Sequence, residues 1–173
     1  GQRVFLELPG LDATLAKVDA FMKQGGLIEF DTRDHETGFS GTGAQTKALT
    51  RLIGQEHSML WMGLYPEEMG SVINRIGAHY LESAKAEIDA GKGLLDGFVI
   101  WGDVAYKNGP FFSPNYWRTY FKPWVARMAE YAHQNGLPVI YHGCGRVHLL
   151  LEDYIEAGID AYNPLEVKAG MDV

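Results

Sequence analysis

The second half of this sequence alternates short apolar runs with longer helical patterns, and this alternation constrains the fold most. Two of these runs are apolar throughout and the third contains one aspartate, and each is bounded by glycine or turn residues, which is typical of a buried strand. The runs are residues 98–101, 137–141 and 159–162, and helical patterns span about 66–90, 114–135 and 147–157. Continuously apolar strands joined by helices pair in parallel under a helical layer. The sequence therefore predicts an α/β fold.

Polar residues follow each predicted strand at the point where it ends. They are Gly102-Asp103, His142-Gly143-Cys144 and Asn163-Pro164-Leu165-Glu166. A (β/α)8 TIM barrel builds its active site from such strand ends, and an open doubly wound sheet also binds ligands there. No dinucleotide-binding fingerprint follows any strand. The pattern favours an enzyme with its site on this rim and leaves the two architectures open.

The first part of the chain gives weaker signals. We expect a helix from Asp12 to about residue 24, a short strand at 27–30, a polar loop over 31–43 and a helix over 46–53. The glycine-rich stretch 38–47 lacks the Gly-Lys-Ser/Thr ending of a phosphate loop, so we reject that function for it.

Length sets the expected domain organisation. A complete barrel needs about 250 residues, and the sequence has 173. We predict one domain over residues 1–173, a fragment of a (β/α)8 barrel whose N- and C-terminal parts are missing. A homodimer is compatible with this expectation.

Composition excludes several classes of partner. The formal net charge of −7 argues against a nucleic-acid or anionic membrane surface. No apolar run approaches the roughly 20 residues that cross a bilayer. A single cysteine cannot form an intrachain disulfide and fits a reducing compartment, so we expect a cytoplasmic protein. We also expect its substrate to be a small molecule.

His142 and Cys144 form the strongest local signal. An imidazole and a thiolate two residues apart at a strand end can face one ion, and such nitrogen and sulfur ligands select zinc. Two ligands are an incomplete site, and a buried cysteine beside a loop histidine is the alternative. Glu166 is a candidate exchangeable fourth ligand, and a solvated loop carboxylate is the alternative.

Asp103 is the candidate catalytic residue, because a carboxylate at a strand end can bind substrate or transfer a proton. A turn-capping aspartate is the alternative. We predict Trp101, Tyr106 and Asn163 to bind substrate together with Asp103. Four aromatic residues at helical spacing are expected in a core or an interface: residues 117, 120, 121 and 124.

Taken as an ordered set, these motifs resemble those of the uroporphyrinogen decarboxylase (URO-D) superfamily over about residues 49–173. The matching elements are Gly102-Asp103, Ser113-Pro114, Pro123, His142-x-Cys144-Gly145, Gly158-Ile159-Asp160, Asn163-Pro164 and Gly170-Met171-Asp172. The resemblance implies a (β/α)8 barrel with a pocket at the carboxyl ends of its strands.

The family's members divide by chemistry. True uroporphyrinogen decarboxylases use no metal and bind substrate carboxylates through arginines near the start of the chain. The other branch includes methylcobalamin:coenzyme M methyltransferases. In that branch a His-x-Cys pair and a distant cysteine hold zinc, which activates a thiol to accept a methyl group.

The pair His142 and Cys144 resembles the zinc-dependent branch. The resemblance implies a methyltransferase that moves a methyl group between a corrinoid, carried on a partner protein, and a thiol. A third cysteine would then lie beyond Val173, and Glu166 would occupy the open zinc position before the thiol arrives. The runner-up is a metal-free decarboxylase of a carboxylated tetrapyrrole-like substrate. A non-catalytic barrel that binds a corrinoid or tetrapyrrole is the third reading.

Overall fold

A computed structural model describes residues 11–23, 39–43 and 45–172. Its helices are α1 (Leu11–Lys23), α2 (Gln45–Ile53), α3 (Gln55–Leu64), α4 (Pro66–Ala90), α5 (Pro114–Tyr120), α6 (Lys122–Gln134) and α7 (Leu151–Glu156). Its strands are β1 (Phe39–Gly43), β2 (Gly97–Trp101), β3 (Ala105–Tyr106), β4 (Gly109–Pro110), β5 (Val139–His142) and β6 (Ala161–Asn163), with 3-10 turns at His148–Leu150 and Val167–Ala169. The strand predicted at 27–30 lies outside the described residues.

The main sheet contains four strands in the order β1-β2-β5-β6, and every pair is parallel. Helices lie between successive strands along the chain, and each strand pairs with the next one in the main sheet. A doubly wound sheet would reverse its strand order at a switch point, whereas a barrel adds each strand beside the last. The arrangement confirms the α/β class and is that of a partial (β/α) barrel.

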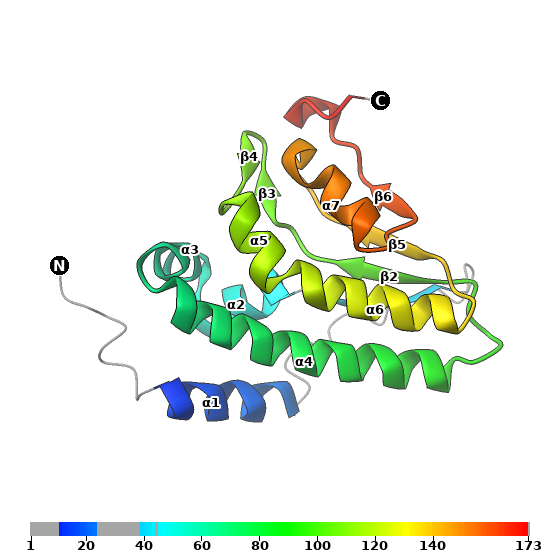
Figure 1. Ribbon diagram of the computed structural model, residues 1–173, viewed down its shortest axis with the longest axis horizontal. Coiled ribbons are helices and arrows are strands. Elements are labelled where there is room, and N and C mark those ends of the chain that lie inside the picture. Colours follow the sequence, from blue (N-terminus) through cyan, green and yellow to red (C-terminus); the bar gives the residue numbers. More distant parts are fainter. Residues whose placement is uncertain (1–10, 24–38, 44, 173) are drawn as a thin grey trace.

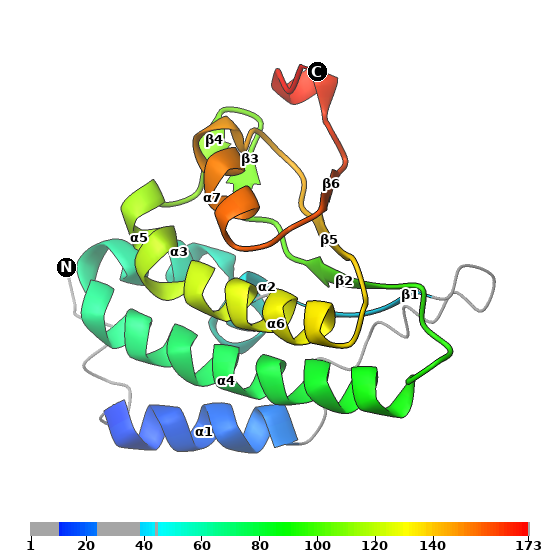
Figure 2. The ribbon, with the colours of Figure 1, turned by 45° about the vertical axis from the view of Figure 1, so that its right-hand side comes forward.

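One face of this sheet lies under helices. Figures 1 and 2 show α4 and α6 running side by side along the sheet, with α1 against the outer side of α4. Phe98, Ile100 and Val139 point into this layer and are fully buried. Their neighbours Val99 and Ile140 are only half-buried because alternate residues of a strand face opposite sides.

Two glycines of α4 bring the helical layer close together. A Cβ atom at Gly70 would overlap the ring of Tyr120, and one at Gly77 would overlap the ring of Trp124. Trp124 also donates its indole N–H to Asn74 Oδ1 at 2.9 Å. The aromatic residues of α5 and α6 therefore belong to the core, one of the two places that the sequence predicted for them.

An ionic cluster joins α5 and α6 to α7. The Asp153 carboxylate is almost fully buried and accepts hydrogen bonds from Arg118 and Lys122, each at 2.9 Å. Burial raises the pKa of Asp153, but the hydrogen bonds from the two cations outweigh burial and lower it. Asp153 is therefore charged at neutral pH and fixes α7 against the preceding helices.

The loop predicted over residues 31–43 is wrong for its last five residues, which form β1. The glycine, serine and threonine of this segment are typical of loops, but its backbone pairs with β2 along its whole length. Gly41 is required there because a side chain would overlap the backbone of Val99. Ser40 faces the helical layer and donates to Glu87 of α4 at 3.0 Å. Pairing with a neighbouring strand therefore overrides local composition.

The predicted strands shift by one or two residues in the structure. β5 begins at Val139 instead of residue 137, because Pro138 has no N–H and contributes only its carbonyl, which accepts from Phe98 N at 2.9 Å.

No helix in the described residues is both long and apolar enough to cross a membrane.

Candidate metal centre

Asp103, His142 and Cys144 come together at the carboxyl end of the sheet. His142 is the last residue of β5, Cys144 lies in the loop after it, and Asp103 lies just beyond β2. The parallel register places Trp101 beside His142, so the two strand ends meet. One potential ligand atom from each of the three side chains lies within 4.8 Å of the others. An imidazole nitrogen, a thiol and a carboxylate thus converge on one point.

A backbone hydrogen bond fixes Asp103 relative to the β5 loop. The Cys144 amide donates to Asp103 Oδ1 at 2.7 Å. The Gly102 amide donates to the His142 carbonyl at 2.9 Å, which extends the strand pairing as far as this point. Carboxylate oxygens have several lone pairs, so Asp103 can bind an ion while it accepts this hydrogen bond.

Asn163 orients the imidazole of His142. The strand register pairs these two residues, and the Asn163 Oδ1 atom lies 2.7 Å from His142 Nδ1. An amide oxygen only accepts hydrogen bonds, so Nδ1 carries the proton and Nε2 presents its lone pair. Metal-binding histidines are commonly held this way by a partner on the second ring nitrogen.

Glu166 lies beside the three residues without being one of them. Its Oε2 atom accepts a hydrogen bond from the Gly145 amide. Gly145 has a φ of +93°, and a Cβ atom there would lie 2.7 Å from the backbone of Ala105. In the part of the chain that the structure describes, the carboxylate of the cluster is therefore Asp103, whereas Glu166 braces the loop after Cys144.

The surroundings of Cys144 raise the pKa of its thiol. Burial contributes most, followed by the negative charges of Asp103 and Glu166. A thiol in such surroundings stays protonated unless a cation compensates the negative charge. The local electrostatics therefore suit a cation held between Asp103 and Cys144.

Two tyrosines hold the ends of β2 and β5 through hydrogen bonds to backbone carbonyls. Tyr141 donates its hydroxyl to the Gly102 carbonyl at 3.0 Å, and Tyr162 donates to the Gly143 carbonyl. Their rings are stacked, with centroids 6.1 Å apart. Burial raises the pKa of both hydroxyls, so they remain neutral hydrogen-bond donors.

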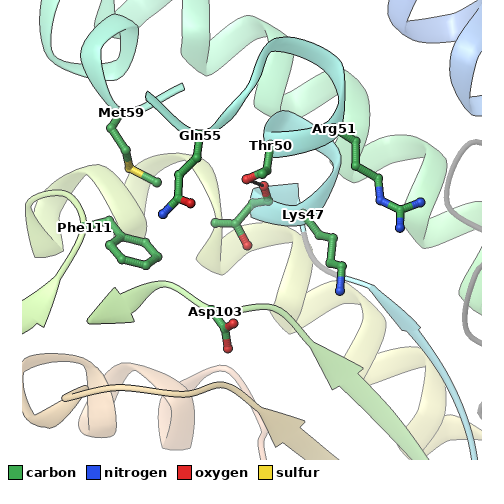
Figure 3. A pocket seen from close by; sticks show the side chains of 8 residues that line it. Lys47, Thr50, Arg51, Gln55, Met59, Asp103 and Phe111 are labelled. Carbon is green, nitrogen blue, oxygen red and sulfur yellow. Dashed lines mark hydrogen bonds between the residues drawn. The ribbon is translucent and has the colours of Figure 1, made fainter. Parts of the chain in front are cut away.

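A cavity of about 260 Å³ opens beside Asp103 (Figure 3). Its lining residues come from α2, α3 and the segments after β2: Thr46, Lys47, Thr50, Arg51, Gln55, Met59, Asp103 and Phe111. The sequence analysis named only Asp103 among them. Lys47, Thr50 and Arg51 recur at helical spacing, which was the one available signal, but that spacing is equally typical of a solvated helix face.

The other predicted substrate-binding residues occupy three different settings. Trp101 ends β2, and the Lys47 ammonium lies 4.2 Å from its ring centroid. Tyr106 is 62% exposed in the β3–β4 hairpin, and Asn163 contacts His142. In the described part of the chain, none of these three residues is among those that line the cavity.

The fold and the site together define a class of protein: a barrel-type α/β protein with a polar centre on the carboxyl rim of its sheet. Residues 34–166, more than half of the chain, match the uroporphyrinogen decarboxylase (URO-D) family. The chain belongs to this family, as the sequence motifs predicted.

One similar solved structure is a methyltransferase from Methanosarcina mazei. It superposes with a TM-score of 0.58 at 19% sequence identity, over 72% of this chain and 34% of that chain. The likeness establishes the fold, and the chain spans about a third of the length of that protein. A search of curated proteins gave no match.

Proposed function

We propose that this chain carries the zinc site of a methyltransferase that moves a methyl group from a corrinoid to a thiol. The convergence of Asp103, His142 and Cys144 within 4.8 Å is the observation that carries the proposal. Three protein ligands of mixed nitrogen, sulfur and oxygen type are characteristic of catalytic zinc sites, which keep one position for substrate. Family membership and the methyltransferase neighbour agree with this reading.

The residues present fit the ion. His142 offers Nε2 because its Nδ1 proton is engaged by Asn163. Asp103 can bind the ion while it accepts the hydrogen bond from the Cys144 amide. Cys144 supplies a thiolate once a cation offsets the charges that raise its pKa. When bound, zinc would hold the acceptor thiol as a thiolate near neutral pH.

The chain's own residues would orient the transfer. As ligands of the ion, His142, Asp103 and Cys144 would fix the position of the acceptor sulfur at the rim, where a methyl carrier could approach from outside the sheet. The acceptor sulfur would form a bond to the methyl carbon as the carbon–cobalt bond breaks and leaves its electron pair on cobalt, and the thiol would give up its proton to a nearby base. Glu166, half-buried beside Cys144, is available to accept that proton.

Metal analysis tests the first part of this proposal. The chain purified without chelator should contain about one zinc ion, and Cys144→Ser should lose most of it. His142→Ala should lose zinc equally, whereas His148→Ala, an exposed histidine a few residues away, serves as the matched control and should keep it. Stoichiometric zinc in both His142→Ala and Cys144→Ser would contradict the proposed ligand set.

Methyl transfer tests the second part. The zinc-loaded chain should convert a thiol to its methyl thioether with a methylated corrinoid as donor, and His142→Ala should abolish conversion. Release of carbon dioxide from a carboxylated tetrapyrrole by the metal-free chain would instead support the decarboxylase reading.

A further inference from the structure

The cavity beside the metal centre has a wall of hydrogen-bond donors. Lys47, Thr50 and Arg51 lie at positions i, i+3 and i+4 of α2, so they share one side of the helix. Thr46, one turn before Thr50, lines the same space. Its side chain is 6% exposed, and its hydroxyl has no hydrogen-bond partner among the described residues. A buried hydroxyl without a partner points to a ligand that supplies one.

The charge around this cavity is opposite to that of the whole chain. The protein carries a formal net charge of −7, yet two cations and one carboxylate line the cavity. The Lys47 ammonium lies 4.2 Å from the ring centroid of Trp101, two residues before Asp103. This contact with an aromatic face keeps the lysine near the end of β2.

The two ends of the cavity differ in polarity. Figure 3 shows Met59, Gln55 and Phe111 grouped toward one end, with Lys47 and Arg51 toward the other. The volume, about 260 Å³, lies below the roughly 300–1,000 Å³ of sites for drug-sized ligands. A small molecule with an apolar body and a charged end matches this shape and polarity.

We propose that this cavity is an anion-binding subsite that holds the charged end of a small substrate while its reacting end reaches Asp103. Lys47 and Arg51 supply the positive charge, and the Thr46 hydroxyl donates a hydrogen bond to the anion. A carboxylate, a sulfonate and a phosphate share the required chemistry. The inference deepens the proposed function and rests on it, because the reacting end is the thiol that meets the metal centre.

Calorimetric titration of the zinc-loaded chain tests the subsite at constant ionic strength. Mercaptopropionate should bind about tenfold more tightly than the uncharged mercaptopropanol, as expected for one charged hydrogen-bonded group. The double variant Lys47→Gln with Arg51→Gln should bring this ratio close to one. Lys92→Gln removes an exposed lysine after α4 and should leave the ratio unchanged.

Titrations of the metal-free chain separate the two proposals. Propionate, propanesulfonate and inorganic phosphate have no thiol, so their binding reports the anion subsite alone. At least one of them should bind, and the double variant should lose it; failure of all three overturns the subsite. Anion binding without any zinc uptake would contradict the proposed function and would still support the anion subsite.

A second pair of outcomes concerns the loaded chain. Equal affinity for the charged and uncharged thiols, with zinc bound, overturns the subsite and leaves the metal centre intact. Retention of the charge preference in the double variant also overturns it. Arg51 is exposed, so Arg51→Gln alone should fold as the parent chain does, and it should lower the ratio if the double variant proves unstable.

Discussion

The two faces of the four-stranded sheet differ in what they contribute. Phe98, Ile100 and Tyr141 face the helices and are at most 1% exposed. Trp101 and His142 lie half-buried on the opposite face, where His142 belongs to the candidate metal centre and Trp101 contacts Lys47 of the cavity wall. Successive residues of the same strands therefore build the core on one side, the covered face, and the candidate site on the other, the chemical face. Substitutions at adjacent positions should separate the two roles.

The largest effect is expected on the covered face. Phe98→Ala removes a fully buried ring and should lower the free energy of unfolding by about 3–5 kcal/mol. Val99→Ala is its matched control one residue along β2, and it should cost about 1 kcal/mol because Val99 is half-buried. Urea denaturation followed by circular dichroism measures both. Similar losses at the two positions would contradict the division between the faces.

The next effect concerns the chemical face. Asn163→Ala removes the acceptor that orients His142 and should weaken zinc binding about 10–100-fold. Thermal stability should change little, because Asn163 is exposed. Competition with a chromophoric chelator gives the affinity, and Asn108→Ala at the exposed hairpin tip is the control. Unchanged zinc affinity in Asn163→Ala would show that His142 needs no such partner.

The titration of Cys144 is expected to respond more modestly. Cys144 is the single cysteine of the chain, so thiolate absorbance in the metal-free protein reports it alone. Burial and the charges of Asp103 and Glu166 raise its pKa, and Glu166→Gln removes one of these charges. The pKa should therefore fall toward its ordinary value in this variant. An unchanged or higher pKa would rule out Glu166 as a source of the shift.

Zinc affinity should follow the same titration. The metal binds the thiolate, so it competes with the proton on Cys144. Because the pKa is raised, affinity should keep increasing with pH beyond the ordinary range of a thiol and should fall on acidification. Affinity that does not vary with pH would mean that Cys144 is not a ligand.

The smallest effect concerns α1, which lies outside both faces of the sheet. Asp19 accepts a hydrogen bond from His79 at 2.8 Å and pairs with Arg75 at 3.3 Å, and the His79 contact lowers the pKa of Asp19 most. A lowered pKa means that the pairing stabilises the protein above the ordinary aspartate pKa and is lost as pH falls through the folded-state value.

Partly exposed pairs of this kind contribute under about 1 kcal/mol. Hydrogen exchange should therefore show α1 amides opening faster in Asp19→Asn, and in the parent chain as acid is added. Glu82→Gln, which breaks a pair within α4, is the control and should leave α1 unchanged. Identical exchange in Asp19→Asn would remove any role for this pair.

The sequence predicted the covered face better than the chemical one. Apolar runs such as 98–101 identified β2, and the residues after the strands placed Asp103, His142 and Cys144 on one rim. The strand β1 was missed because its glycine, serine and threonine carry no apolar signal. Its position depends on pairing with β2, which local composition does not encode.

The cavity was missed for a related reason. Lys47 and Arg51 are typical of an exposed helix, and only the packing of α2 beside β2 brings them near Asp103. The preference for Asp103 over Glu166 in the cluster also depends on tertiary structure. A hydrogen bond from the Cys144 amide draws Asp103 toward Cys144, while Glu166 is engaged by Gly145.

The fit of Tyr120 and Trp124 over Gly70 and Gly77 limits how the helices can move relative to the rim of the sheet. The two glycines are seven residues apart on α4, so the two rings occupy notches two helical turns apart. Sliding α5 and α6 by one turn would place larger side chains of α4 under both rings. The two contacts therefore allow a single packing register of α5 and α6 along α4. New specificities on this scaffold should then arise by exchange of rim loops over an unmoved frame.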